Sequence, residues 1–230
     1  MNFESYLGAI PLLHSWDGGL SWNSGGFEVN HLREIYEFGC KNLPFGPCII
    51  ETGAGNSTIC FLHLRPSMLV TIAPDSDLFD RILTYCVEAN IDVSALDAHV
   101  DCSEWALPAL ALPTRTSGPE FDFALIDGSH NWPMVMLDFF YVNFLVKKGG
   151  FIMVDDVQLH SVKELARLLV WDTKNFALRA DLGKSLIFEK LTAQRTLPEW
   201  NGQPYVNTLS ERYMETGRPF ALDLAPDISR

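Results

Sequence analysis

The stretch that decides the fold is Cys48-Ile49-Ile50-Glu51-Thr52-Gly53-Ala54-Gly55-Asn56-Ser57-Thr58. A short apolar run ends at an acid, two glycines follow one residue apart, and hydroxyl side chains open the next segment. This order is typical of a buried strand, a ligand-holding turn and a helix N-terminus. The glycines allow the backbone to approach a ligand closely, and the amide groups after them can bind an anion. A glycine pair alone is weak evidence, so the rest of the chain must indicate what the turn holds.

The overall composition limits the classes of protein that fit this chain. It has 230 residues, 47% hydrophobic and 20% charged, which is ordinary for a globular protein with one large domain. No apolar run reaches the ~18 residues that span a bilayer, and no secretory signal is visible, so we expect a cytoplasmic protein without a membrane partner. The five cysteines form no C-x-x-C pair and indicate neither disulfides nor zinc. A net charge of −12 with scattered Lys and Arg argues against a nucleic-acid partner.

Strand and helix patterns alternate along the middle of the chain. Strands are expected at 48–51, 68–73, 95–100, 121–126 and 151–154. Helices are expected at 30–39, 57–64, 77–90, 103–112, 133–146, and after the fifth strand as far as about 171. Lys147-Lys148-Gly149-Gly150 is expected to end the helix before the fifth strand, because cations and glycine favour helix C-termini. Residues 175–180 and 185–191 are typical of an antiparallel pair. The alternation predicts an α/β fold, a parallel sheet with helices on both faces.

The segments outside this alternation give weaker signals. Residues 1–44 hold an irregular arm and a helix, and the arm alternates tryptophan with glycine at 16–19 and 22–26. This arm is either a surface segment packed on the domain or a lid over a pocket. Residues 45–191 would form the main domain, and residues 192–230, without clear periodicity, a C-terminal tail packed on it. The sequence does not fix the oligomeric state, and a homodimer is compatible with it.

Acids follow almost every expected strand, at Glu51, Asp75, Asp101, Asp127 and Asp155-Asp156. In such sheets ligands bind beyond the carboxyl ends of the strands. An acid beside the glycine turn would repel a pyrophosphate, whereas S-adenosylmethionine fits, because its sulfonium and ammonium are positive and its ribose hydroxyls can pair with an acid. An NAD(P)-dependent oxidoreductase is the alternative, but Glu51 and Thr58 count against a dinucleotide-binding turn.

Glu51-Thr52-Gly53-Ala54-Gly55 resembles the first motif of the class I S-adenosylmethionine-dependent methyltransferases. The acids after the next three strands follow in the family's order, and the pair near 175–191 resembles its reversed terminal strand. The resemblance covers about residues 45–191, which would be the methyltransferase domain. It implies a doubly wound, Rossmann-like, mostly parallel sheet of seven strands in the order 3-2-1-4-5-7-6, with strand 7 antiparallel.

The resemblance also implies which residues contact the cofactor. These are Glu51, Gly53, Gly55, Ser57, Asp75, Asp101, Cys102 and Asp127. The glycine turn would hold the amino-acid and ribose end of S-adenosylmethionine, with Ser57 near its carboxylate. Asp75 would accept the ribose hydroxyls, although Ala73 occupies the place where that acid often stands. Asp101 and Cys102 would lie near the adenine. Each of these acids has a plain alternative role as a helix N-cap.

Three aspartates follow the fourth and fifth strands, which should be neighbours: Asp127, Asp155 and Asp156. Clustered carboxylates repel one another, and Mg²⁺ would relieve that repulsion. The arrangement resembles the metal-dependent O-methyltransferases of the catechol type and of macrolide sugars. In that scheme the metal holds two neighbouring substrate oxygens and lowers the pKa of a hydroxyl. Asp155 could instead cap the following helix and bind no ion.

His130 lies three residues after Asp127, where the catechol-type enzymes carry a lysine. A histidine there could take the hydroxyl proton as general base, with Asp127 beside it, because its pKa is near the operating pH. Alternatively, it makes a hydrogen bond within the turn. The sequence therefore predicts an O-methyltransferase acting on a small hydroxylated metabolite or natural-product intermediate. A non-catalytic cofactor-binding subunit would keep the fold but would not respond to substitution of Asp127 or His130.

Overall fold

A seven-stranded sheet forms the centre of the computed structural model, which describes residues 1–14, 26–112 and 120–216. The tryptophan- and glycine-rich arm, at 16–26 in the prediction, lies almost wholly outside these residues. The strands are β1 (Cys48–Thr52), β2 (Met68–Ala73), β3 (Leu96–Val100), β4 (Phe121–Ile126), β5 (Val146–Val154), β6 (Phe176–Asp181) and β7 (Leu186–Lys190). Their order is β3-β2-β1-β4-β5-β7-β6, with β1 to β5 parallel and β7 antiparallel to both of its neighbours. The predicted fold class and strand order are confirmed.

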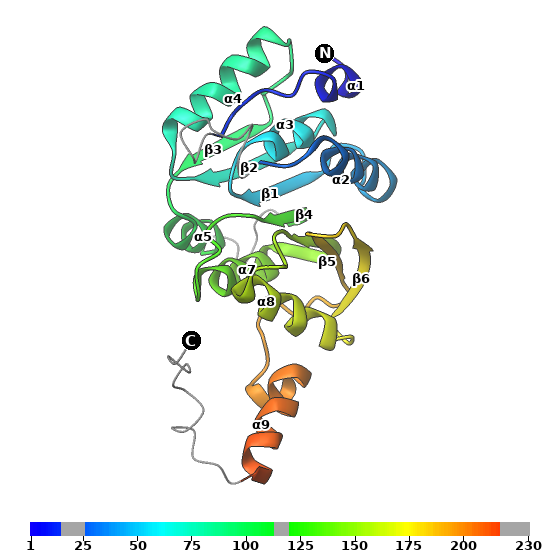
Figure 1. The fold of residues 1–230 in the computed structure, drawn as a ribbon, viewed down its shortest axis with the longest axis vertical. Coiled ribbons are helices and arrows are strands. Elements are labelled where there is room, and N and C mark those ends of the chain that lie inside the picture. Colours follow the sequence, from blue (N-terminus) through cyan, green and yellow to red (C-terminus); the bar gives the residue numbers. More distant parts are fainter. Residues whose placement is uncertain (15–25, 113–119, 217–230) are drawn as a thin grey trace, which may run out of the picture.

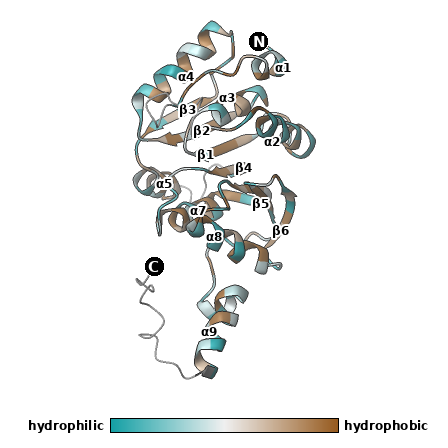
Figure 2. Ribbon diagram, in the orientation of Figure 1, coloured by the Kyte–Doolittle hydropathy of each residue, from teal (hydrophilic) through white to brown (hydrophobic). Residues whose placement is uncertain are grey.

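Helices cover both faces of this sheet (Figure 1). One face carries α1 (Phe3–Leu7), α2 (Val29–Asn42), α3 (Asn56–His63) and α4 (Ser76–Glu88), and the other carries α5 (Ser103–Ala111), α7 (Met134–Leu145) and α8 (His160–Trp171). Neighbouring residues of one strand belong to opposite cores, as Ile49 and Ile50 do, because successive side chains alternate between faces. Strands buried on both faces read as continuous apolar runs, and Figure 2 shows β1 and β4 in brown. None of the helices in the described ranges combines the length and hydropathy that a bilayer span requires.

The junction between α7 and β5 differs from the prediction. The helix ends at Leu145, and β5 begins at Val146, so the Lys147–Gly150 run lies in a strand and does not end a helix. Val146 pairs with Phe121 of β4, and the register then shifts, which accommodates the extra residues of β5. Lys147 makes an ion pair with Asp122 of β4. The prediction was wrong because the lysine serves a partner on the neighbouring strand, which local sequence does not reveal.

The C-terminal segment contains a helix that the sequence pattern did not predict. A short 3₁₀ turn, η1 (Trp200–Gly202), leads into α9 (Pro204–Thr216), which extends from the body near α8 (Figure 1). The Tyr205 ring packs edge-on against Trp171 with 5.7 Å between ring centroids, and its hydroxyl donates to Glu164. Val206 beside it also packs against the core, so a short contact at the start of α9 replaces the long apolar stripe by which a helix is predicted from sequence.

Candidate active site

The expected site residues meet at the carboxyl ends of the central strands. The amide of Asp127 donates to the carbonyl of Thr52 at 3.0 Å, and the amide of Asp155 donates to the carbonyl of Ile126 at 3.1 Å. The amide of Gly53 bonds in the same way to the end of β2. These bonds continue the sheet by one residue beyond each strand. The glycine turn, the Asp127 turn and the Asp155-Asp156 pair therefore lie side by side.

Glu51 is fully buried at the end of β1, and each of its carboxylate oxygens accepts a hydroxyl hydrogen bond. Ser57 and Thr71 are the donors, each at 2.8 Å. Burial raises the pKa of Glu51 to about 7, although the neighbouring hydroxyls oppose the shift. The structure thus directs the Ser57 hydroxyl to Glu51, and both side chains brace the glycine turn. Their predicted contacts with a cofactor stay predictions.

The two glycines of the turn are there for different reasons. Gly53 has a φ of 89°, and a Cβ at this position would lie 2.4 Å from the carbonyl oxygen of Asp127. The β1 and β4 turns can therefore touch only through a glycine. Gly55 has a φ of 154°, and a Cβ there would lie 2.4 Å from Nε2 of His14. The imidazole of the N-terminal segment thus rests directly on the turn.

The segment that carries His14 is anchored on both sides of the glycine turn. The Tyr6 hydroxyl donates to the backbone carbonyl of Asn56 at 3.0 Å, at the start of α3. The Arg81 guanidinium donates to the carbonyl of Leu13 at 3.1 Å, from α4. Burial, followed by the charge of Arg81, lowers the pKa of His14. Sequence reasoning missed this histidine, because only tertiary packing brings residues 1–14 to the ends of β1 and β2.

The acids after β2 and β3 have separate surroundings. Asp75 caps α4 by accepting from the Leu78 amide at 3.0 Å, and its other oxygen lies 3.5 Å from the Arg81 guanidinium. Asp101 is exposed and accepts from the amide of Cys102 at 2.8 Å. The capping role weighed for Asp75 is therefore present. Asp101 and Cys102 stand at the entry to α5, and their predicted place near the adenine stays a prediction.

Asp127, His130 and Asp156 form one cluster. Nε2 of His130 lies 3.6 Å from a carboxylate oxygen of each aspartate, just beyond hydrogen-bond length. This nitrogen is buried and has no hydrogen-bond partner among the described residues. Asp127 raises the pKa of His130 by more than burial lowers it, and Asp156 adds to the rise. Burial raises the pKa of Asp127 to about 7 even though His130 opposes this. The pKa values of both groups are therefore raised, so each binds a proton more readily than its free side chain does.

Asp155 is separated from this cluster by its own partners. Its side chain is 1% exposed, and its two oxygens accept from Nζ of Lys184, at 2.8 Å, and from the hydroxyl of Ser185. The same ammonium lies 3.3 Å from Asp156. Nε2 of His31 completes the group, 2.8 Å from the Ser185 oxygen. Lys184 thus contacts two of the three aspartates that were predicted to bind a metal ion, and the metal site stays a prediction.

Asp138 of α7 is a further acid that sequence reasoning missed. Asp138 is 0% exposed to solvent, and neither of its carboxylate oxygens has a hydrogen-bond partner among the described residues. Burial raises its pKa to about 6, and the nearby hydroxyls of Ser103 and Thr52 limit the rise. A Cβ at Gly128 would lie 3.2 Å from this carboxylate. The signal available in the sequence was a single acid within the apolar run 134–145.

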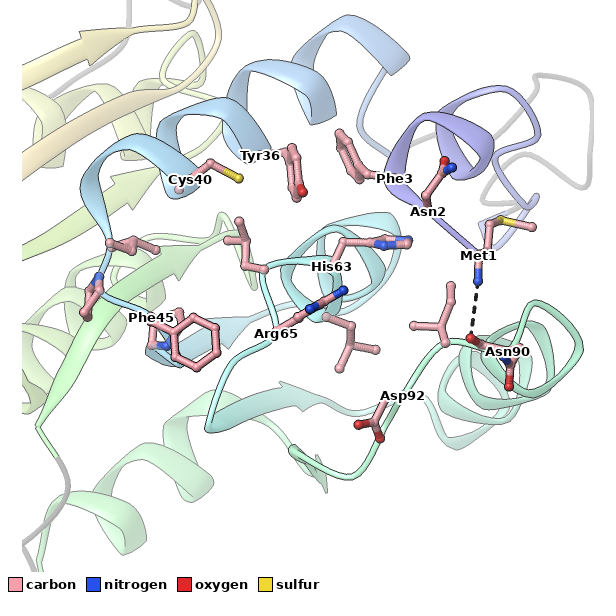
Figure 3. A pocket seen from close by; sticks show the side chains of 17 residues that line it. Met1, Asn2, Phe3, Tyr36, Cys40, Phe45, His63, Arg65, Asn90 and Asp92 are labelled. Atoms are coloured by element: carbon pink, nitrogen blue, oxygen red, sulfur yellow. Dashed lines mark hydrogen bonds between the residues drawn. The ribbon is translucent and has the colours of Figure 1, made fainter.

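A cavity of about 630 Å³ lies away from these residues (Figure 3). Its lining includes Pro47 just before β1, Arg65 before β2 and Asp92 before β3. These positions are the amino ends of the strands, opposite the edge that carries the acids. The cavity therefore has no part in the candidate active site.

Comparison with known proteins agrees with this geometry. A family model described as a methyltransferase domain matches residues 50–157, which run from the glycine turn past the Asp155-Asp156 pair. No curated protein matches the sequence.

Solved structures similar to this chain include three methyltransferases. One is the O-methyltransferase TomG from Streptomyces achromogenes, which is involved in tomaymycin synthesis and was solved with SAM. Its TM-score is 0.59 at 17% identity, and the alignment covers 73% of this chain and 82% of the TomG chain. A putative caffeoyl-CoA O-methyltransferase from Staphylococcus aureus has a TM-score of 0.56 at 12% identity, with 70% and 82% covered. A putative rRNA methylase from Clostridium thermocellum has 0.55 at 12%, with 71% and 97% covered. At such identities the likeness concerns the fold. The chain therefore has the fold of these methyltransferases, and its residues 50–157 resemble a methyltransferase domain.

Proposed function

We propose that the chain is an O-methyltransferase that acts on a small hydroxylated molecule, with His130 as the general base. The observation that carries the proposal is the position of Nε2 of His130. It is buried, lacks a hydrogen-bond partner among the described residues, and lies 3.6 Å from both Asp127 and Asp156. A base of this kind, at the strand end next to the glycine turn, suits removal of a hydroxyl proton.

The residues present fit S-adenosylmethionine as methyl donor. The glycine turn lies at the carboxyl edge of the sheet, where ligands of such folds bind, and the buried acid Glu51 lies beneath it. The start of α3 offers amide groups for a carboxylate. When bound, the cofactor supplies a methyl group made electrophilic by its sulfonium. The cofactor of TomG, solved in complex with SAM, supports the same assignment for this chain.

The chain's own residues would do three things in the reaction. The neutral imidazole of His130 accepts the proton of the substrate hydroxyl at Nε2. Asp127 and Asp156, each 3.6 Å away, stabilise the imidazolium that forms. Their fixed positions at the ends of β4 and β5 orient the ring, so that little reorganisation accompanies the proton transfer.

The charge of the site favours a neutral or cationic substrate. Asp127, Asp155 and Asp156 lie along one edge of the sheet, and the basic groups that pair with them among the described residues are the ammonium of Lys184 and the ring of His130. The whole chain carries a net charge of −12. A polyanion such as RNA would be repelled by both. We therefore favour a small hydroxylated metabolite, and the O-methyltransferases with this fold support that class.

A magnesium-assisted form of the reaction is the second candidate. One observation favours it: single ligand atoms of Asp127, His130 and Asp156 all lie within 4.8 Å of one another. This donor set differs from the three aspartates expected from the sequence, because Asp155 is occupied by Lys184 and Ser185. Carboxylates suit Mg²⁺ well, whereas an imidazole is a less typical ligand for it. Activity that disappears in a chelator and returns with Mg²⁺ would establish this form.

Two measurements test the main proposal. Calorimetry with S-adenosylmethionine and with NAD(P) identifies the cofactor, and we expect heat with the first alone. Incubation with the methyl donor and a panel of small phenols, sugars and aliphatic alcohols, followed by detection of S-adenosylhomocysteine, identifies the acceptor. Binding of NAD(P) without binding of S-adenosylmethionine would overturn the assignment. Binding of the methyl donor with turnover that is insensitive to His130→Ala would overturn the role of the base.

A further inference from the structure

We propose that Lys184 is the built-in cation of the acid cluster, so that the domain holds Asp155 and Asp156 without a divalent metal ion. The inference rests on the proposed function in one respect, because it takes these strand ends as the place of the reaction. Lys184 is then a positioning residue. It fixes the acids beside His130 through charge and hydrogen bonds, which a metal would do in the magnesium-assisted form.

The contacts of the ammonium carry this inference. Nζ of Lys184 donates to Asp155 at 2.8 Å and to Asp156 at 3.3 Å, so it bridges the two neighbouring carboxylates. The ring of Phe27 lies on another side, with its centroid 4.6 Å from Nζ. Burial lowers the pKa of Lys184, but Asp155 and Asp156 outweigh it and leave the pKa raised. The ammonium is thus charged and held from two directions.

The backbone places Lys184 there with little freedom. The turn between β6 and β7 reaches the carboxyl edge of the sheet because β7 runs antiparallel to β5. Gly183 adopts a φ of 81° within this turn, and the Leu182 amide donates to the Ser185 carbonyl at 2.9 Å. The carbonyl of Lys184 in turn accepts from the amide of Val157, again at 2.9 Å. The reversed strand therefore delivers a lysine directly to the acid pair.

Both oxygens of Asp155 already accept a hydrogen bond in this arrangement. One oxygen accepts from Lys184, and the other accepts from the Ser185 hydroxyl, which also contacts His31 at 2.8 Å. Asp156 is shared as well, because one of its oxygens accepts from the Gln158 amide at 2.9 Å and from Lys184. A divalent cation bound between these acids would face the ammonium at short range, and like charges at that distance repel strongly.

Metal binding measured without turnover tests the role of Lys184. Mn²⁺ would be titrated into the full-length wild type, Lys184→Met and Lys147→Met, and its free signal followed by electron paramagnetic resonance. Lys147 is the matched control, because it pairs with Asp122 at the opposite end of the sheet. We expect weak binding to the wild type and to Lys147→Met, and binding about tenfold tighter or more to Lys184→Met, because the competing cation is gone. Equal Mn²⁺ affinity in all three proteins, or tight binding by the wild type, overturns the inference.

Thermal unfolding supplies a second readout. Lys184→Met should melt at a lower temperature, since it leaves the buried Asp155 unpaired, and Mn²⁺ should restore part of the loss. Lys184→Arg should keep the wild-type midpoint and stay unresponsive to Mn²⁺. Should Lys184→Met not fold, Lys184→Gln removes the charge but keeps a hydrogen-bond donor, and the same Mn²⁺ response decides. A destabilised variant that Mn²⁺ does not stabilise would count against the inference. Failure of methyl transfer bears on the proposed function alone, because neither readout requires a substrate.

Discussion

The turn after β1 and the turns after β4 and β5 share one edge of the sheet but differ in how their polar atoms are satisfied. In the first turn both carboxylate oxygens of Glu51 accept hydroxyl hydrogen bonds, and the Gly55 amide donates to Thr58 at 3.0 Å. Beside the later turns, Nε2 of His130 and both oxygens of Asp138 are buried without a hydrogen-bond partner among the described residues. Among the described residues, the first turn leaves one such atom, Oγ1 of Thr52, whereas the second region leaves three.

This difference fits a division of roles, in which the first turn binds the cofactor and the second region carries out the reaction. A turn whose acid and first amide are hydrogen-bonded is rigid and suits a cofactor that must always bind in one pose. Buried groups without partners cost about 1–3 kcal/mol each, and they persist mainly where a ligand or a proton transfer makes use of them. The pKa of Asp127, which burial raises to about 7, is a further property typical of a reactive site. Substitutions that affect one region and spare the other test this division of roles.

Removal of the His130 imidazole should have the largest effect. We expect His130→Ala to lower kcat by about 10²–10⁴-fold, because the hydroxyl proton would have no acceptor, and to leave binding of S-adenosylmethionine unchanged. Methyl transfer and calorimetry on the same preparation measure the two quantities. His160→Ala is the control, since His160 is exposed at the start of α8. A variant that loses cofactor affinity but keeps its turnover would reverse the division of roles between the two regions.

Gly53→Ala should damage the first region instead. The new Cβ would lie 2.4 Å from the Asp127 carbonyl oxygen at a φ of 89°, so the two turns must move apart. We expect a loss of roughly 2–4 kcal/mol in the free energy of unfolding and weaker cofactor binding. Gly183→Ala is the matched control, because Gly183 has a φ of 81° and no heavy atom within 4 Å of its Cβ position. It should lose only about 1 kcal/mol from backbone strain. Equal losses in both variants would show that contact between the turns is unimportant.

The charge of Glu51 should make stability depend on pH. Its folded pKa is raised to about 7, above the model-peptide value, so the folded state binds the proton more tightly than the unfolded state does. Stability from this group is therefore full below about pH 4 and is lost as the pH rises through 7. We expect Glu51→Gln to remove this part of the pH dependence, which amounts to roughly 1–3 kcal/mol between pH 5 and 8. Urea unfolding of both proteins across this range would measure it, and parallel curves would contradict the expectation.

Much of the fold could be predicted from the sequence because its signals are local. The apolar run 48–52 and its counterparts at 68–73 and 121–126 are buried on both faces, so they read as strands without any partner information. The glycine turn and the acids follow directly, since a parallel sheet gathers all its strand ends at one edge. Asp127 and His130 were predictable for the same reason. Their separation along the chain is short, and one turn holds both.

The rest depends on contacts between distant segments. Lys184 reaches Asp155 only because β7 inserts between β5 and β6, an order that strand patterns alone do not encode. His14 reaches Gly55 through a segment anchored by Tyr6. The ion pair of Lys147 turned an expected helix end into a strand. In each case a residue with several local interpretations takes its role from a neighbour far away in the sequence.

The smallest expected effect is that of replacing Asp156, which lies near both His130 and Lys184. Methyl transfer needs the neutral imidazole, and because the pKa of His130 is raised, the rate should climb with pH through a midpoint above 6.5. Asp127 is the main cause of the rise and Asp156 a lesser one, so Asp156→Asn should move this midpoint downward, and Asp127→Asn should move it further. The pH profile of kcat/KM measures both shifts, with the exposed Asp101→Asn as control. Because Asp156 also contacts the ammonium of Lys184, an upward shift in Asp156→Asn would mean that the lysine, and not the aspartate, dominates the field at the ring.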